Sequence, residues 1–224
     1  MKINHALIMA AGRGQRMMPL TDEIPKAMAV VDGITLISQG IGNIKRHLDN
    51  VYITVGYKGA MLASHVIENN VSALFNTEGK GNAWWIFNTL VKHINEPIFV
   101  LTCDNIIELD FDSLSKDYFA QGEPTCMIVS VPPLLGLDGD YISKDANNCI
   151  IELNRNKKTD VYCSGIQIIN PFKVNKLVSS CEDFYNVWET LMEKKELRCS
   201  NIQPSKWISI DTLEQLNKAN SQKD

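Results

Sequence analysis

The chain has 224 residues, 45% of them hydrophobic, which is enough to bury one substantial core, and no stretch marks an obvious place to divide it. Its formal net charge of −4, without a large lysine and arginine cluster, argues against a nucleic-acid-binding surface. No apolar run reaches a transmembrane length and the N-terminus lacks the pattern of a signal peptide, so we expect a cytoplasmic protein without a membrane partner.

The cysteines and histidines are dispersed along the chain. No C-x-x-C pair occurs, and several cysteines lie in apolar runs, so we expect reduced thiols that pack as small core residues. The four histidines are likewise dispersed, and no zinc-binding spacing is visible. The six cysteines are Cys103, Cys126, Cys149, Cys163, Cys181 and Cys199.

The chain opens with an apolar run over 5–9, which predicts a buried strand because it is uninterrupted and too short for a helix. A loop with Gly12 and Gly14 follows it. Glycine permits positive φ and leaves room for consecutive N–H groups to face one anion. Arg16 and Lys26 add cations to this loop, so it suits a nucleoside triphosphate better than an uncharged ligand.

Two alternatives compete for this loop. A dinucleotide fold needs a G-x-G-x-x-G turn and an acidic residue at the end of the second strand. Met17 stands at the third glycine position, and the second predicted strand, 51–55, runs into Gly56-Tyr57-Lys58 instead of an acid. The dinucleotide reading is therefore disfavoured, whereas a plain glycine turn with solvated charges stays open on local sequence alone.

Helices and strands alternate through the first half of the chain. Apolar spacing predicts a helix over 35–48, a strand over 51–55, a helix over 60–68 and a short strand over 73–75. This order predicts an α/β fold with a Rossmann-like, mostly parallel sheet flanked by helices. Ligands of such sheets bind beyond the carboxyl ends of the strands, where the opening loop is expected.

Two further segments follow predicted strands. The glycine-rich stretch 76–83 leads into a helix that is expected to run to about Lys92, and Asn82 could simply cap that helix. The most apolar strand, 98–103, runs into Asp104, and a carboxylate at this edge of the sheet can hold a divalent cation. The alternative is that Asp104 only caps a turn.

The second half has a different pattern. It predicts a helix over 112–121, a strand over 125–131, a β-hairpin over 141–153, a strand over 162–169 and helices over 171–178 and 184–194. A last strand over 207–210 precedes a helix that opens at Asp211. Asp211 followed by Glu214 also fits a helix-capping arrangement, so that role stays open beside a metal-binding one.

The opening motif resembles the signature of the sugar-phosphate nucleotidyltransferases, A-A-G-x-G-[ST]-R-[LM]-x-P-L-T followed by P-K. Residues 10–21 and 25–26 match it in order, except that Gln15 replaces Ser or Thr. Near the other end, Ile210-Asp211-Thr212 is similar to the I-D-[ST] pattern of the choline-phosphate cytidylyltransferase branch. The resemblance implies a nucleotide-diphospho-sugar transferase fold, with the hairpin and the following strand as a lid over the acceptor.

The resemblance also implies roles for individual residues. Glu152 and Gly165 would bind the acceptor, although the E-K-P that usually follows this glutamate is replaced by Leu153-Asn154-Arg155. Asp104 and Asp211 would hold Mg²⁺, while Arg16 and Lys26 would act on the phosphates. The implied nucleotide-binding residues are Ala10, Ala11, Gly12, Arg13, Gly14, Asn76, Gly81 and Asn82.

The expected protein is one nucleotidyltransferase domain over 1–224, with a nucleotide-binding part over 1–131 and an acceptor and lid part over 132–224. It would join a nucleoside triphosphate to a sugar 1-phosphate and release pyrophosphate (EC 2.7.7). A cytidylyltransferase for a phosphocholine-like or other small phosphorylated acceptor is the second candidate, and a catalytically silent nucleotide-binding regulator is the third. No added acyltransferase domain is expected, and the oligomeric state stays open.

Overall fold

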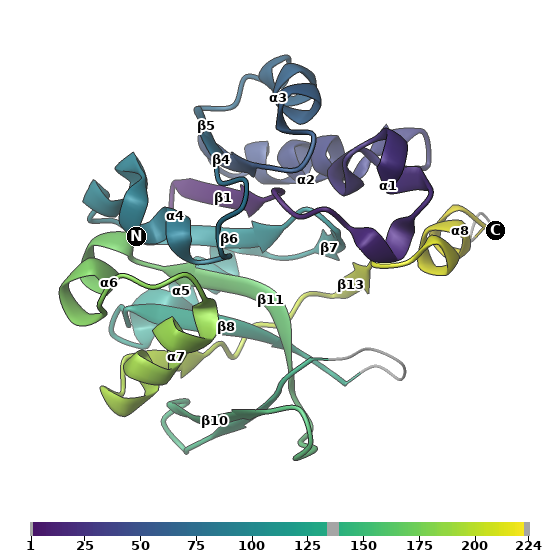
Figure 1. Ribbon diagram of the computed structural model, residues 1–224. Coiled ribbons are helices and arrows are strands. Elements are labelled where there is room, and N and C mark those ends of the chain that lie inside the picture. Colours follow the sequence, from purple (N-terminus) through teal and green to yellow (C-terminus); the bar gives the residue numbers. More distant parts are fainter. Residues whose placement is uncertain (1, 134–138, 222–224) are drawn as a thin grey trace. The chain divides into compact units, whose positions relative to one another are not determined.

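The computed structural model describes residues 2–133 and 139–221. The chain forms two compact units, each built from several segments of the sequence. Unit 1 contains residues 1–3, 81–100 and 109–205, and unit 2 contains residues 4–80, 101–108 and 206–224. Figure 1 shows their helices and strands. The prediction of one domain divided at residue 131 is not tested by this grouping and stays a prediction.

Unit 2 contains a parallel sheet. β1 (His5–Met9), β4 (Asn50–Val55) and β5 (Ala73–Asn76) lie side by side, with Ala6 opposite Val51 and Tyr52 opposite Ala73. Helix α2 (Leu36–Lys45) connects β1 to β4, and α3 (Gly59–Ile67) connects β4 to β5. Continuous apolar runs form these strands because helix crossovers cover parallel sheets on both faces. The predicted parallel α/β arrangement is confirmed here.

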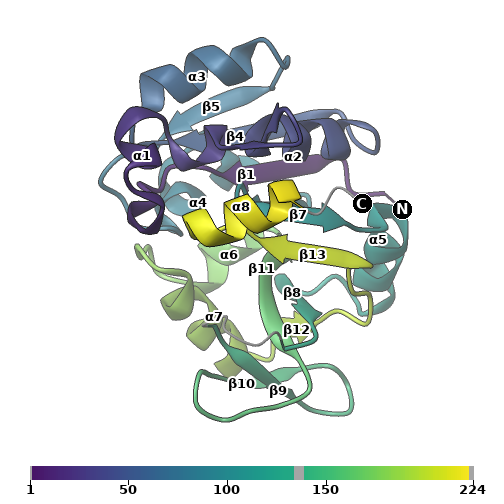
Figure 2. The same cartoon turned by 90° about the vertical axis from the view of Figure 1, so that its right-hand side faces the viewer.

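A second part of unit 2 joins distant stretches of sequence. β7 (Asn105–Glu108) pairs antiparallel with β13 (Lys206–Ser209), and Asn105 lies opposite Ser209. Helix α8 (Leu213–Ser221) follows β13 and is seen beside it in Figure 2. Apolar side chains of α8 pack in one cluster with side chains of β7, β13 and the hairpin of β2 (Val30–Val31) and β3 (Ile34–Thr35). This cluster fixes residues 206–221 beside the end of strand β6.

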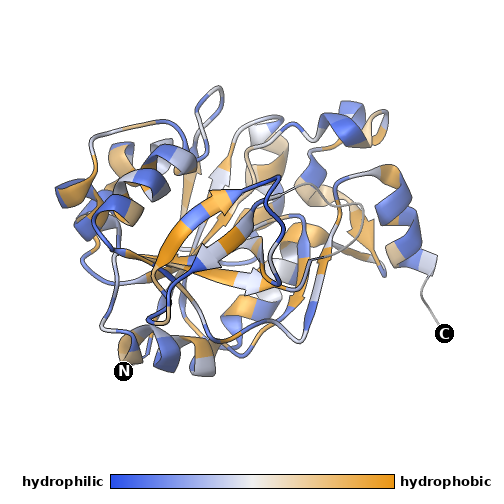
Figure 3. Cartoon of the chain, turned by 90° about the horizontal axis from the view of Figure 1, so that it is seen from below, coloured by the Kyte–Doolittle hydropathy of each residue, from blue (hydrophilic) through white to orange (hydrophobic). Residues whose placement is uncertain are grey.

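Strand β6 (Ile98–Thr102) begins in unit 1 and ends in unit 2. In unit 1 its first residues pair antiparallel with β11 (Tyr162–Ile169), which also pairs with β8 (Cys126–Val131) and β9 (Tyr141–Lys144). β9 forms a hairpin with β10 (Ile150–Asn154), and β8 pairs parallel with β12 (Leu197–Cys199). The predicted hairpin is confirmed. Figure 3 shows apolar residues along many strands of the chain, with hydrophilic residues among them.

The helices of unit 1 follow the predicted order. They are α4 (Trp84–Asn88), α5 (Phe111–Ala120), α6 (Pro171–Leu177) and α7 (Phe184–Glu193). No helix within 2–133 and 139–221 has both the length and the apolar character needed to cross a membrane.

One helix is shorter than the sequence predicts. The helix expected to reach Lys92 ends at Asn88, and a separate 3-10 turn covers Leu90–His93. Thr89 lies between them in an extended conformation, with φ −113° and ψ 175°. Its hydroxyl donates to Trp85 O and accepts from Val91 N–H. A threonine side chain that bonds to nearby backbone competes with the helix, and here it ends the helix and starts the next turn.

Candidate active site

The glycine-rich loop after β1 is held by specific contacts within unit 2. Ala10 is buried, and its N–H donates to Thr54 Oγ1 at 3.1 Å. Gly14 has φ +66°, and a Cβ there would lie 2.8 Å from Lys26 Cβ. Glycine is therefore required both by its backbone conformation and by the close approach of Lys26. A 3-10 turn, Gln15–Met17, and the short helix α1 (Leu20–Glu23) complete the loop.

Lys26 lies at the centre of the predicted constellation. It begins a 3-10 turn, Lys26–Met28, after Pro25, and it is only 9% exposed. Its Nζ donates to Asp104 Oδ2 at 2.5 Å and to Asp211 Oδ1 at 2.7 Å. Burying an ammonium is costly unless it is paired, and two carboxylates supply that pairing here.

The two carboxylates reach Lys26 from opposite halves of the sequence. Asp104 follows β6, and Asp211 follows β13. The Ile210 N–H donates to Asp104 O at 2.8 Å, so the β7–β13 pairing continues directly into the site. Arg16 Nη2 lies 2.9 Å from Asp211 Oδ1, although the Arg16 side chain is 68% exposed. The structure therefore brings Arg16, Lys26, Asp104 and Asp211 together, as the sequence predicts.

The start of α8 is capped by residues other than the Asp211 side chain. Thr212 Oγ1 accepts from Gln215 N–H, and Gln215 Oε1 accepts from the N–H groups of Asp211 and Thr212. Thr212 and Gln215 thus form a reciprocal capping box, and the Asp211 carboxylate faces Lys26 and Arg16. Ser209 Oγ donates to Asp211 Oδ2 at 2.9 Å and orients it.

The charges of this cluster stabilise one another. Burial alone would raise the pKa of Asp211, but the hydrogen bond and charge of Lys26, Ser209 and Arg16 hold that pKa below its usual value. Burial likewise opposes the charged form of Lys26, whereas Asp104 and Asp211 raise the Lys26 pKa above its usual value. Both groups are therefore charged at neutral pH.

A cavity of about 480 Å³ opens beside these side chains. That volume is within the range of small-molecule sites. Backbone of the glycine-rich loop and the charged side chains form its wall, and its lining residues include Gly12, Arg13, Gly14, Gln15, Arg16, Lys26, Asp104 and Asp211. Two carboxylates beside a cavity can hold a divalent cation, because Mg²⁺ takes one or two protein carboxylates and completes its shell with phosphate and water oxygens. The donor set thus fits the predicted metal.

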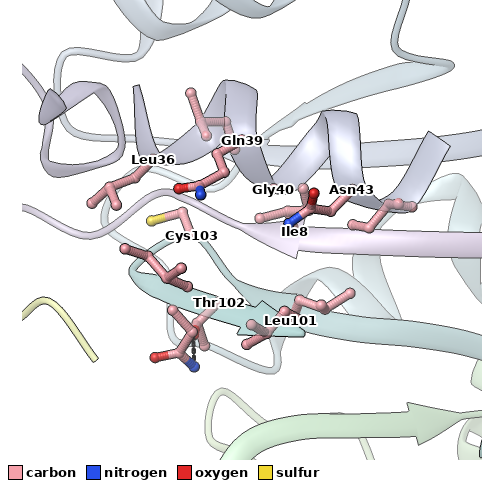
Figure 4. A pocket seen from close by; sticks show the side chains of 13 residues that line it. Ile8, Leu36, Gln39, Gly40, Asn43, Leu101, Thr102 and Cys103 are labelled. Atoms are coloured by element: carbon pink, nitrogen blue, oxygen red, sulfur yellow. Dashed lines mark hydrogen bonds between the residues drawn. The ribbon is translucent and has the colours of Figure 1, made fainter. Parts of the chain in front are cut away.

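A second cavity in unit 2, of about 20 Å³, shares the lining residues Thr102 and Cys103 with the first and has room for a water molecule but not for a nucleotide. Figure 4 shows Gln39, Gly40 and Asn43 of α2 on one side and Thr102 and Cys103 on the other. Burial raises the pKa of the Cys103 thiol, and the charge of Asp104 raises it further. Cys103 is therefore a neutral packing residue, in line with its predicted role.

Three other predicted nucleotide-binding residues are not among those that line the 480 Å³ cavity. Asn76 ends β5 in unit 2, where it is exposed and its Oδ1 accepts from Glu78 N–H. Gly81 and Asn82 belong to unit 1. The Gly81 N–H donates to Glu182 Oε2 at 2.7 Å, and Asn82 Oδ1 accepts from Phe184 N–H at 2.9 Å. Asn82 therefore caps the start of α7, not of α4, and the nucleobase role of both residues stays a prediction.

The structure gives Gly81 a packing reason that the sequence did not reveal. A Cβ at this position would overlap the carbonyl oxygen of Glu182. We expect Gly81→Ala to lower the free energy of unfolding by about 1–3 kcal/mol, because the backbone has to move apart. Urea unfolding measures this change in the free energy of unfolding. Gly42→Ala is the matched control, since nothing lies within 4 Å of that Cβ and α2 should gain up to about 1 kcal/mol. Equal stability of Gly81→Ala and wild type would contradict this packing role.

The two predicted acceptor-binding residues also lie in unit 1. Glu152 accepts from Lys157 Nζ at 2.6 Å and from Asn154 Nδ2 at 3.0 Å. Gly165 has φ +81° and lies where the register of β11 against β8 shifts. A glycine at such an irregularity is explained by its backbone conformation. Acceptor binding by either residue stays a prediction.

Several residues beside the site were not singled out from the sequence. Thr21 is 1% exposed, and its hydroxyl donates to Gly14 O at 3.1 Å. Tyr57, two residues after the end of β4, donates from its hydroxyl to Thr21 O at 2.8 Å. Thr21 belongs to the matched motif, whereas the position of Tyr57 directly after a parallel strand was the one signal that could have indicated it.

Comparison with known proteins places the chain among nucleotide-transferring enzymes. Residues 5–136 match the family described as nucleotidyl transferase. The bifunctional protein GlmU of Methanococcus aeolicus is 29% identical over 165 residues, which cover 72% of this chain and 39% of GlmU. The UTP–glucose-1-phosphate uridylyltransferase AglF of Haloferax volcanii is 28% identical over 116 residues, covering 50% of this chain and 47% of AglF. This chain therefore matches less than half the length of either relative.

The fold also matches solved structures over nearly its full length. The CTP:phosphocholine cytidylyltransferase LicC of Streptococcus pneumoniae superposes with a TM-score of 0.76 at 18% identity, covering 98% of this chain and 97% of LicC. At this identity the similarity shows the fold. The predicted fold class is confirmed.

Proposed function

The chain belongs to the nucleotidyl transferase family, and from this premise we propose that it joins a nucleoside triphosphate to a sugar 1-phosphate and releases pyrophosphate. The observation that carries the proposal is the convergence of two cations and two carboxylates beside a cavity of about 480 Å³. A relative named as a UTP–glucose-1-phosphate uridylyltransferase supports this choice of acceptor.

The reaction brings two polyanions together. A phosphate oxygen of the acceptor attacks the α-phosphorus of the triphosphate, and the bond from that phosphorus to the oxygen bridging to the β-phosphate breaks, so pyrophosphate leaves. Positioning and charge neutralisation are sufficient for this displacement, without a covalent protein nucleophile.

Different residues of the site would bind the phosphates and the metal in this reaction. Gly12, Arg13 and Gly14 line the cavity, and backbone N–H groups of this loop would bind phosphate oxygens, as glycine-rich loops do. Arg16 would bind the leaving phosphates and Lys26 the reacting ones. Asp104 and Asp211 would hold Mg²⁺, which when bound neutralises phosphate charge. In the free protein Lys26 pairs with both carboxylates, so it has to turn toward the phosphates when the substrates bind.

A cytidylyltransferase for a phosphocholine-like acceptor is the second candidate. The I-D-[ST] pattern assigns the acid to Asp211, and in the structure this carboxylate pairs with Lys26 and Arg16 and accepts from Ser209 Oγ. The similarity to a phosphocholine cytidylyltransferase fits this candidate as well. A silent nucleotide-binding regulator is less well supported, because Lys26 and both acids are retained. Action in the cytoplasm is part of the proposal.

A pyrophosphate-release screen separates the three candidates. CTP, UTP, GTP and dTTP are each combined with Mg²⁺ and with glucose 1-phosphate, N-acetylglucosamine 1-phosphate or phosphocholine. Release with a sugar 1-phosphate supports the first candidate, and release with CTP and phosphocholine alone supports the second. Nucleotide binding without release from any pair would support the third and refute catalysis.

A further inference from the structure

The connection between β4 and α3 lies directly against the glycine-rich loop of unit 2. The Tyr57 N–H donates to Ala11 O at 3.0 Å. A Cβ on the preceding residue, Gly56, would lie 2.7 Å from the same oxygen and 2.9 Å from Ala11 Cβ. Gly56 is therefore needed for the approach that lets Tyr57 reach the first part of the loop.

The side chain of Tyr57 reaches the other end of the same loop. Its hydroxyl donates to Thr21 O at 2.8 Å. Thr21 in turn donates from its own hydroxyl to Gly14 O at 3.1 Å. One residue of the β4–α3 connection thus binds the loop near its start and near its end, and Thr21 extends the connection to Gly14 in the middle.

The ring of Tyr57 also faces a cation of the site. The guanidinium carbon of Arg13 lies 5.4 Å from the ring centroid, within the range of a cation–π interaction. Arg13 lines the same cavity as Arg16 and Lys26. On the same ring, Lys58 Nζ lies 5.6 Å from the centroid. The Tyr57 ring therefore restricts the movement of Arg13, whose planar guanidinium is well suited to bind phosphate.

We propose that Tyr57 is a positioning residue for the triphosphate, acting through the loop 11–21 and through Arg13. This inference rests on the proposed function for the identity of the anion. A loop held at both ends loses less conformational freedom when it binds an anion, so its affinity is higher than that of a free loop. Tyr57 does not need to touch the reacting atoms for this effect.

Two substitutions separate the hydroxyl from the ring. Tyr57→Phe removes only the bond to Thr21 O, and it should weaken binding of Mg²⁺–tripolyphosphate, a base-free polyanion, roughly three- to tenfold. Tyr57→Leu also removes the ring that contacts Arg13 and should weaken the binding of Mg²⁺–tripolyphosphate by more than about tenfold. Isothermal titration measures both. Tyr52→Phe is the matched control, because this tyrosine of β4 bonds to His5 Nδ1 and should leave polyphosphate affinity unchanged.

A second measurement does not depend on any ligand. Hydrogen exchange of the amides over 11–21 should be faster in free Tyr57→Phe than in wild type, while the melting temperature stays within the range of the Tyr52→Phe control. In turnover assays the KM for the triphosphate should rise, with the KM for the acceptor unchanged. Unchanged loop exchange, or unchanged polyphosphate affinity in Tyr57→Leu, would overturn the role of Tyr57. Failure of the wild type to bind tripolyphosphate or any of the four triphosphates would instead refute the proposed function.

Discussion

Replacement of Lys26 by methionine is expected to lower turnover at least about a hundredfold while the protein stays folded. Methionine keeps a long unbranched side chain in this buried position but has no charge to bind the reacting phosphates. A contact of this kind contributes about 3–4 kcal/mol at the transition state. The rate of pyrophosphate release measures the loss. Lys116→Met, an exposed position on α5, is the control and should keep normal turnover.

The same variant has a readout that requires no substrate. In the free protein the Lys26 ammonium lies 2.5 and 2.7 Å from oxygens of Asp104 and Asp211, so a divalent cation has to compete with it for these oxygens. Without the ammonium the two carboxylates are left close together, with only the exposed Arg16 side chain paired with Asp211. Lys26→Met should therefore bind Mn²⁺ alone more tightly than wild type in a calorimetric titration. Near-normal turnover would refute the catalytic role of Lys26, and weaker Mn²⁺ binding would refute the competition.

Asp104→Asn is expected to cause a comparable loss of turnover, about a hundredfold or more. Asparagine keeps the size of the side chain but loses the charge that pairs with Lys26 and that would attract Mg²⁺. The Mg²⁺ concentration that gives half-maximal activity should rise as well. Asp49→Asn, at an exposed position of unit 2, is the control and should change neither value.

A double substitution tests whether the two acids act on one cation. If Asp104 and Asp211 hold the same metal, either single substitution already removes most of the metal's contribution to turnover. The loss of turnover in the double variant Asp104→Asn/Asp211→Asn, expressed as a free energy, should then be clearly smaller than the sum of the two single losses. Full additivity of the two losses would show that the acids act separately. Normal turnover of folded Asp104→Asn would remove Asp104 from the mechanism.

The sequence was sufficient to predict the members of the charged cluster. Gly14, Arg16 and Lys26 lie in one motif with fixed spacing, and Asp104 directly follows the most apolar strand, so each has a local signal. Asp211 was harder to assign as the metal-binding acid, because Ser209 and Asp211 both lie near the end of the last predicted strand. Only the resemblance favoured Asp211. Local reasoning also could not decide between a metal ligand and a helix cap for Asp211, whereas in the structure Thr212 and Gln215 supply the cap.

Contacts between distant residues were beyond the reach of such reasoning. The β7–β13 pairing joins residues about a hundred positions apart, and each strand is only four residues long, too short for a distinctive pattern. Gly81 carries a recognisable motif, but its contact with Glu182 depends on a close approach that no periodicity encodes. The pairing of Lys26 with both carboxylates is likewise a property of the folded chain, because each partner alone would also fit a solvated surface group.

The late position of β13 in the sequence has a consequence for biosynthesis. During translation the glycine-rich loop, Lys26 and Asp104 are synthesised within the first half of the chain. The partner strand of β7 and the carboxylate of Asp211 are synthesised only near residue 210. A nascent polypeptide that has not reached this point exposes the apolar side chains of β7 and carries Lys26 with one of its two counter-ions. The charged cluster is therefore complete only after residue 211 has been translated.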